Sequence, residues 1–159
     1  MSCGIKIMHE YYMYEALKQA KKAYKIGEIP IGAVVVFKDK IIARAYNKRE
    51  KLQDSTAHAE LIAIKKACKF LGSWRLEECD LYVTLEPCPM CAGAIIQSRM
   101  KNVFYGAKNS RFGAHQGAIN LFSVNFNHFV NVKAGILEED CSKLISSFFT
   151  ELRKNKVKS

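Results

Sequence analysis

Long apolar runs are missing from this sequence. The longest convincing one, residues 31–37, is far shorter than the roughly 20 residues that a membrane-spanning helix needs. Near the start, Lys6, His9 and Glu10 stand where a secretory signal would have roughly 7–15 apolar residues. Repeats, low-complexity tracts and linkers are also lacking. We therefore expect a cytoplasmic protein whose 159 residues form a single domain, 1–159.

Acidic residues are scarce relative to basic ones. The chain has 15 Asp and Glu against 25 Lys and Arg, which gives a formal charge of +10. A domain this basic attracts polyanions, and nucleic acid is the commonest polyanion of a cytosol. A lysine-rich genome would produce the same excess, so charge alone identifies no function.

Disulfide bonds are not expected, because the six cysteines stand in a chain without a secretion signal. Four of them lack the spacing of metal ligands and are interpreted as buried free thiols: Cys3, Cys68, Cys79 and Cys141. The remaining pair, Cys88 and Cys91, is three residues apart and follows a proline.

Hydrophobic periodicity predicts alternating helices and strands. Apolar residues at helical spacing predict helices at 8–25, 58–71, 88–98 and 138–153. β-rich runs predict strands at 31–37, 41–46, 81–85, 103–107 and 129–135. The first two strands form a hairpin through 38–40, the long segment 108–127 is a functional or mobile loop, and the basic tail 153–159 is expected to fray. This order predicts an α/β fold, a three-layer α-β-α sandwich with a mixed five-stranded sheet.

Two short motifs contain metal-ligand side chains, His58-Ala59-Glu60 and Pro87-Cys88-Pro89-Met90-Cys91. Thiolates three residues apart in the first turn of a helix lie on one face, and the helix N-terminus favours their deprotonation. With one imidazole they give three zinc ligands, His58, Cys88 and Cys91, which leaves the fourth tetrahedral position open, as a catalytic site requires. With this composition the two motifs occur together by chance in about one in a thousand sequences.

Glu60 is the candidate catalytic acid and base. Residues two apart on a regular helix point about 200° apart, so His58 and Glu60 share a cavity only if His58 lies at the loop–helix junction. Thr56 is predicted to cap that junction. The alternative is a solvated acid that the helix dipole favours in the first turn, but the cysteine pair makes the catalytic interpretation the better one.

The two metal motifs, in this order, resemble the signature of the cytidine deaminase superfamily. Further segments resemble the bacterial tRNA adenosine deaminases, which make inosine at the anticodon wobble position: 29–34, 46–47, 56–60, 81–88, 91–94 and 106–107. The resemblance covers about residues 8–155 and is looser in the last third. It implies a cytidine deaminase-like fold, one Zn²⁺ per subunit, hydrolytic deamination with Glu60 as proton shuttle, a tRNA anticodon stem-loop as partner, and a homodimer whose RNA sites draw on both subunits.

The resemblance also implies which residues bind the RNA. Asn47 matches a position that hydrogen-bonds the flipped base, while Phe149 and Arg153 match an aromatic and a basic residue that contact the anticodon loop. Phe149 and Arg153 are four residues apart and so lie on one helix face. In the long loop, Lys108 and Arg111 are candidates for phosphate contacts. The simpler alternatives are a strand-end asparagine for Asn47 and solvated surface for the two basic residues.

Asn109 departs from the family pattern, which usually has Asp at this place. The change removes a negative charge close to where the substrate sugar is expected to lie. Repulsion from phosphate then drops, and we expect discrimination between ribose and deoxyribose to loosen.

Two other functions share part of this pattern. A deaminase of a free base or nucleoside, of the guanine or cytosine type, has the same motifs, but a small neutral substrate needs neither the +10 charge nor an aromatic and basic C-terminal helix. A catalytically silent RNA-binding or structural zinc module needs neither Glu60 nor an open metal position.

Overall fold

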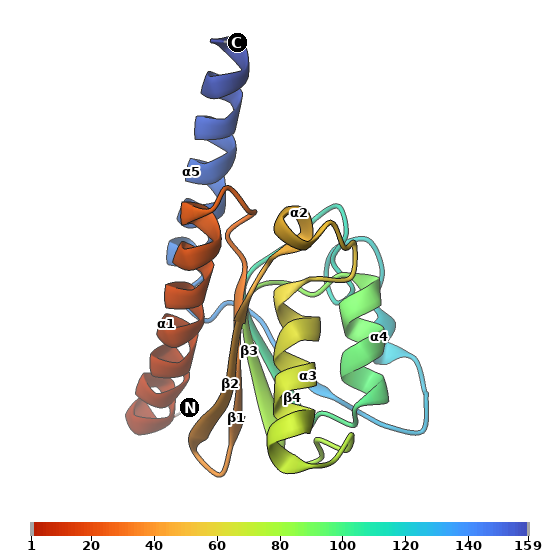
Figure 1. Ribbon diagram of the computed structural model, residues 1–159. Helices are drawn as coiled ribbons and strands as arrows, with labels where there is room; N and C mark the ends of the chain where they lie inside the picture. Colours follow the sequence, from red (N-terminus) through yellow and green to blue (C-terminus); the bar gives the residue numbers. More distant parts are fainter. Residues whose placement is uncertain (1, 159) are drawn as a thin grey trace.

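The computed structural model describes residues 2–158, and its centre is a sheet between two helical layers (Figure 1). The elements have the following bounds: α1 Cys3–Lys25, β1 Gly32–Phe37, β2 Lys40–Tyr46, α2 Arg49–Leu52, α3 Ala59–Leu71, β3 Cys79–Leu85, α4 Pro89–Gln97, β4 Asn102–Ala107, η1 Leu121–Ser123, β5 Asn131–Lys133 and α5 Glu138–Val157. Helices α1 and α5 cover one face of the sheet, and α3 and α4 cover the other. The predicted three-layer α-β-α sandwich is confirmed.

The sheet is mixed, as predicted, with strand order β2-β1-β3-β4-β5. Strand β1 pairs antiparallel with β2 and β3, whereas β4 pairs parallel with β3 and β5. Because parallel strands end at the same edge, Leu85 of β3 lies beside Ala107 of β4. The segments that follow these two strands, the second metal motif and the long loop, therefore begin side by side.

The core has two halves, one on each face of the sheet. Successive strand residues point to opposite faces, so Val34 and Tyr82 pack under α1 and α5, while Val35 and Val83 pack under α3 and α4. Gly32 lets α1 approach the sheet closely, since a Cβ there would lie 2.0 Å from the backbone oxygen of Ala16. This packing holds α3 and α4 firmly and so fixes where their N-termini lie.

The predicted elements are present, but several ends differ. The 38–40 hairpin is confirmed, with Lys38 and Asp39 at φ 48° and 62°, which suits a tight two-residue turn. Helix α1 begins at Cys3 because the Ser2 side chain accepts a hydrogen bond from the Ile5 amide. The last strand is only three residues long, and the four-residue α2 lies in a stretch where we expected no element.

Three predictions are wrong. The basic tail does not fray at 153, because α5 continues to Val157 through residues of good helix propensity with no Gly or Pro to stop it. Thr56 does not cap α3: its hydroxyl bonds the Asp54 carboxylate, and His58 is the N-cap residue. The scattered cysteines are not all buried, since Cys3 is exposed and Cys68 half-buried.

Other expectations on the cysteines and on membrane spans can be compared directly. All six cysteines are free thiols, and Cys79 and Cys141 are buried as predicted. Within residues 2–158, every helix is too short or too polar to cross a bilayer.

Candidate metal centre and substrate cavity

Two helix N-termini bring the metal motifs together. His58 is the N-cap of α3 and Cys88 the N-cap of α4, both with extended backbone (φ −78°, ψ 151° and φ −75°, ψ 170°). Pro89 starts α4, which suits its fixed φ and missing N–H, and Cys91 lies in the first turn. Neither N-cap side chain bonds its own helix, so both side chains are available to the shared site.

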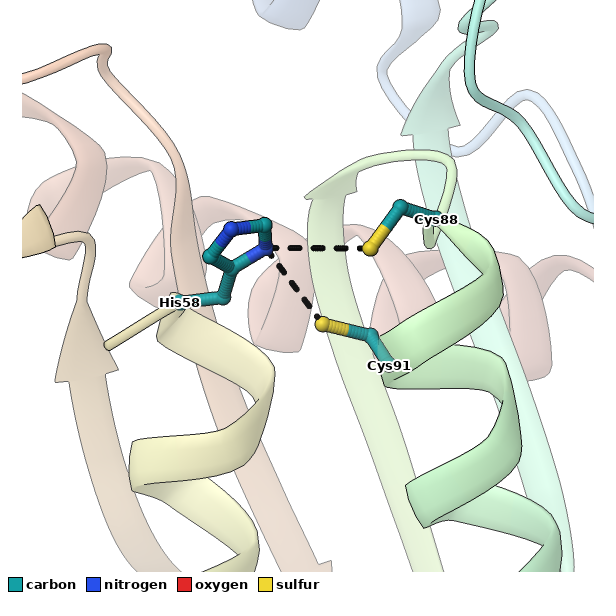
Figure 2. A group of neighbouring side chains, drawn as sticks. All are labelled: His58, Cys88 and Cys91. Atoms are coloured by element: carbon teal, nitrogen blue, oxygen red, sulfur yellow. Dashed lines mark hydrogen bonds between the residues drawn. The ribbon is translucent and has the colours of Figure 1, made fainter. Parts of the chain in front are cut away.

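The His58 imidazole points at both sulfurs (Figure 2). Its Nδ1 atom lies 3.8 Å from Cys88 Sγ and 3.5 Å from Cys91 Sγ. Within residues 2–158, these are the side chains whose ligand atoms all lie within 4.8 Å of one another. The expected His-Cys-Cys set is therefore assembled around one point.

The spacing of these atoms suits a tetrahedral zinc ion. Zn–N bonds of roughly 2.0–2.1 Å and Zn–S bonds of roughly 2.3 Å at tetrahedral angles place nitrogen and sulfur about 3.6 Å apart. The two measured N–S distances, 3.5 and 3.8 Å, lie on either side of that value. One nitrogen and two sulfurs are also a donor set that zinc prefers.

The two thiols differ in acidity. The pKa of Cys88 is lowered to about 4, mainly because it accepts a hydrogen bond from Cys91 and also because it lies beside His58. The pKa of Cys91, which donates that bond and is buried, is raised. The pKa of His58 is raised, chiefly by its hydrogen bond to Cys88. An anion is thus already favoured at the centre of the cluster.

Glu60 lies behind the cysteines and is only 3% exposed. Its Oε2 atom is 3.4 Å from Cys91 Sγ. It reaches the cluster because His58 lies at the junction, outside the regular helix, as expected. Burial raises the pKa of the Glu60 carboxyl. The alternative of a solvated first-turn acid is wrong for this residue.

A cavity of about 970 Å³ opens in front of the cluster. His58, Glu60 and Cys88 line it. Five of the residues selected from the sequence for RNA contact line it as well: Lys108, Asn109, Arg111, Phe149 and Arg153. The structure thus brings these five, from the long loop and α5, to one cavity with the metal motif.

Asn47 is not among the residues that line this cavity. It is buried at the end of β2, its Nδ2 donates to the Ile29 carbonyl, and its own amide donates to the Ile31 carbonyl. Ile29 and Ile31 do line the cavity. Among residues 2–158 the Asn47 Oδ1 atom has no hydrogen-bond partner, which is costly for a buried amide oxygen unless a ligand supplies a donor.

The sequence analysis missed Glu86, which directly follows the strand predicted at 81–85 and received no role there. The residue is 1% exposed, and its carboxylate accepts hydrogen bonds from four backbone amides of the long loop. An acidic residue directly after a fully buried strand was the available signal, because buried carboxylates need partners.

Comparisons with known proteins agree with this geometry. A model of the MafB19-like deaminase family matches residues 7–153. A tRNA-specific adenosine deaminase of Bacillus subtilis (strain 168) is 55% identical over 92% of each chain. A structure from a study of A-to-I editing by tRNA:A34 deaminases superposes with a TM-score of 0.81 at 41% identity, over 84% of this chain and 98% of that one. A guanine deaminase from Bacillus subtilis superposes with a TM-score of 0.62 at 38% identity, over 74% and 86%. These likenesses confirm the predicted deaminase-like fold.

Proposed function

Because the chain belongs to the MafB19-like deaminase family and, within it, to the tRNA-specific adenosine deaminases, we propose that it converts adenosine to inosine at the wobble position of a tRNA anticodon loop. The observation that carries the proposal is the buried Glu60 carboxyl, which contacts Cys91 of the three-ligand cluster and lines a cavity that basic side chains also line. A structural metal site would not place a buried acid and a cavity at its open side.

His58, Cys88 and Cys91 would hold one Zn²⁺ per subunit. When bound, zinc acts as a Lewis acid that makes a water molecule a good nucleophile near neutral pH. Glu60 takes a proton from the attacking water and delivers it to N1 of the adenine as the water oxygen attacks C6. It then takes the proton of the new C6 hydroxyl group and gives it to the C6 amino nitrogen; the C6–N bond breaks, ammonia leaves, and the product is inosine. One carboxyl serves both steps because its protonation state alternates.

The remaining cavity residues would bind the RNA. A base must leave its stack before its C6 can reach the three-ligand cluster. Asn47 does not line the cavity itself but bonds Ile29 and Ile31, which do, and its Oδ1 would accept a hydrogen bond from that base. Phe149 offers a ring for stacking, and Arg153, Lys108 and Arg111 offer cations for phosphates.

The wider setting follows from the family resemblance. We expect a cytoplasmic, single-domain protein that forms a homodimer with RNA sites drawing on both subunits. Phe112, Phe126 and Phe129 are large apolar side chains that are exposed in the single chain and that a partner subunit would cover. Sedimentation velocity at micromolar concentration tests the dimer, and a species of one chain would exclude it.

The decisive experiment is to incubate the purified, zinc-loaded protein with total tRNA and to map inosine. We expect inosine at the wobble position and ammonia in equal amount. The likeness to a guanine deaminase makes guanine the first competing substrate to assay, followed by cytosine and cytidine. Ammonia from one of these and none from tRNA would replace our proposal with the free-base function.

A further inference from the structure

Glu86 is a buried acid that the proposed chemistry leaves without a role. It follows the last residue of β3 and extends the sheet by one step, because its amide donates to the Ala107 carbonyl at 2.8 Å. Its side chain is thereby directed into the loop that follows β4. A buried carboxylate is stable only when hydrogen bonds or opposite charges compensate it.

Four loop amides provide that compensation. The Asn109 N–H donates to Oε1 at 3.2 Å. The consecutive N–H groups of His115, Gln116 and Gly117 donate to Oε2 at 3.0, 3.0 and 2.9 Å. Consecutive amides around one oxygen form an anion-binding concavity. Four N–H donors facing two oxygens suit an ionised carboxylate, which only accepts hydrogen bonds.

The loop backbone is closely fitted to this carboxylate. A Cβ on Gly113 would lie 2.0 Å from Glu86 Oε2, and a Cβ on Gly117 would lie 2.1 Å from the Asn109 carbonyl oxygen. The Gly113 amide also bonds that Asn109 oxygen at 2.8 Å. The segment 109–117 is therefore wrapped around one side chain from outside the loop.

The same segment forms one wall of the cavity. Residues 108–112 all line it, and Asn109 is both a wall residue and a donor to Glu86. Asn109 Oδ1 accepts a hydrogen bond from the Phe112 amide at 3.1 Å. This bond also restrains the backbone between Asn109 and Phe112, which lines the cavity. Glu86 itself borders the cavity, but loop amides already occupy both of its oxygens.

We infer that Glu86 is a positioning residue for RNA, whose carboxylate holds loop 109–117 so that Lys108 and Arg111 face the substrate phosphates. This inference rests on the proposed tRNA function. It assigns Glu86 to binding of the RNA and not to the bond-breaking step, because the Glu86 oxygens bond loop amides, whereas Glu60 and the metal ligands lie at the N-termini of α3 and α4.

Glu86→Gln tests the inference with little change in size. An amide offers only one oxygen, so either the Asn109 N–H or the 115–117 amides then face an NH₂ group and lose their acceptor. Asp80→Asn is the matched control: it removes one carboxylate charge from the other end of β3, about 20 Å away, where Asp80 accepts from Asn102 at 2.6 Å. A general effect of charge on RNA affinity would appear in both variants.

We expect Glu86→Gln to weaken binding of the anticodon stem-loop by about tenfold or more, with one zinc per chain and a single-turnover rate at saturating RNA within about twofold of wild type. The plot of log K against log salt should lose about one to two units of slope, since phosphate contacts are lost. Asp80→Asn should keep the wild-type slope. Unchanged affinity and slope in Glu86→Gln, or loss of zinc with it, overturns the inference.

A double-mutant cycle locates the effect. If Glu86 acts through the two cations, adding Glu86→Gln to Lys108→Ala/Arg111→Ala weakens binding little further, whereas full additivity contradicts the inference. Hydrogen exchange of amides 109 and 115–117 should accelerate in Glu86→Gln but not in Asp80→Asn. If wild type forms no inosine in tRNA, the proposed function fails; if wild type is active and the cycle is additive, only the role of Glu86 fails.

Discussion

His58 and Glu60 show how one backbone residue decides whether two side chains can cooperate. On a regular helix they would point about 200° apart. His58 has extended backbone and Glu60 has helical backbone, so the imidazole reaches the sulfurs from one side and the carboxyl reaches Cys91 from within α3. A continuous helix through residue 58 would separate the metal ligand from the acid.

Replacing Glu60 by Ala should separate metal binding from chemistry. Zinc content should stay at one per chain, because the three ligand side chains are unchanged. The rate of inosine formation should fall by about 10²–10⁴-fold, since a positioned proton carrier is lost. Both are measured on the same preparation, by metal analysis and by single-turnover assay on tRNA.

The matched control is Glu139→Ala, which removes an exposed acid from the first turn of α5. Glu139→Ala removes a first-turn acid from a helix but leaves the residues that line the cavity unchanged. The variant should therefore keep the wild-type rate of inosine formation. Near wild-type turnover by Glu60→Ala would refute the assignment of the proton shuttle.

Asn109 offers a test of sugar selectivity in which the loop stays in place. Its Oδ1 accepts from the Phe112 amide, and an aspartate oxygen can accept the same bond. Asn109→Asp therefore changes charge while keeping the turn. We expect the variant to prefer an RNA hairpin over its DNA counterpart more strongly than wild type does, because a carboxylate beside the sugar accepts a stronger hydrogen bond from the ribose 2′-hydroxyl, which deoxyribose lacks. The measurement is the ratio of kcat/KM on paired RNA and DNA hairpins, and equal ratios in the two proteins would reject the hypothesis.

At the scale of helices and strands, the sequence was sufficient where a local pattern sets the structure. β-rich apolar runs predicted all five strands, and the Cys88–Cys91 spacing predicted two sulfurs on one face of α4. Contacts between segments that are far apart along the chain leave no such local pattern in the sequence. Nothing near Glu86 in the sequence shows that residues 109–117 will fold around it. The start of α1 did have a local signal, because Ser2 is a residue type that commonly caps helices, and the prediction overlooked it. Thr56 failed as a cap because Asp54, two residues away, competes for its hydroxyl.

The packing of α1 on the sheet predicts a pH dependence of stability. His9 is buried, its Nδ1 lies 2.6 Å from the Tyr82 hydroxyl, and its ring lies 4.3 Å from that of Phe104. Burial, helped by Lys133 and opposed by Asp80, lowers the pKa of His9 below its ordinary value. The folded state thus favours neutral His9, whereas the unfolded chain takes up its proton near pH 6.5.

The contribution of His9 to stability is therefore complete above about pH 6.5 and is lost as pH falls through the lower folded-state pKa. We expect the unfolding free energy to fall between pH 7.5 and 5.5, and to fall less in His9→Gln, which does not titrate. Urea unfolding at several pH values measures this. An exposed substitution on the same helix, Lys6→Gln, should keep the wild-type slope, and an equal slope in His9→Gln would show that His9 does not contribute.

At the scale of the whole molecule, the excess of basic residues can be either a binding surface or a lysine-rich composition. The positions of the basic residues in the structure allow these two explanations to be distinguished. Arg153 lines the cavity on the exposed part of α5, whereas Lys40 lies in the β1–β2 hairpin at the other end of the sheet (Figure 1). If only the net charge of the protein determines its affinity for tRNA, Arg153 and Lys40 contribute equally. If a basic surface near the site determines it, Arg153 contributes and Lys40 does not.

Binding of tRNA should therefore weaken steeply with salt, while deamination of a neutral nucleoside, if detectable, should not. Each lost phosphate contact lowers the slope of log K against log salt by about one unit. Arg153→Ala should lose about that much, and Lys40→Ala, with the same change in net charge, should keep the wild-type slope. Equal losses in both variants would show that the charge reflects composition alone, and the surface around the cavity would then have to bind RNA through its apolar residues, Phe149 foremost.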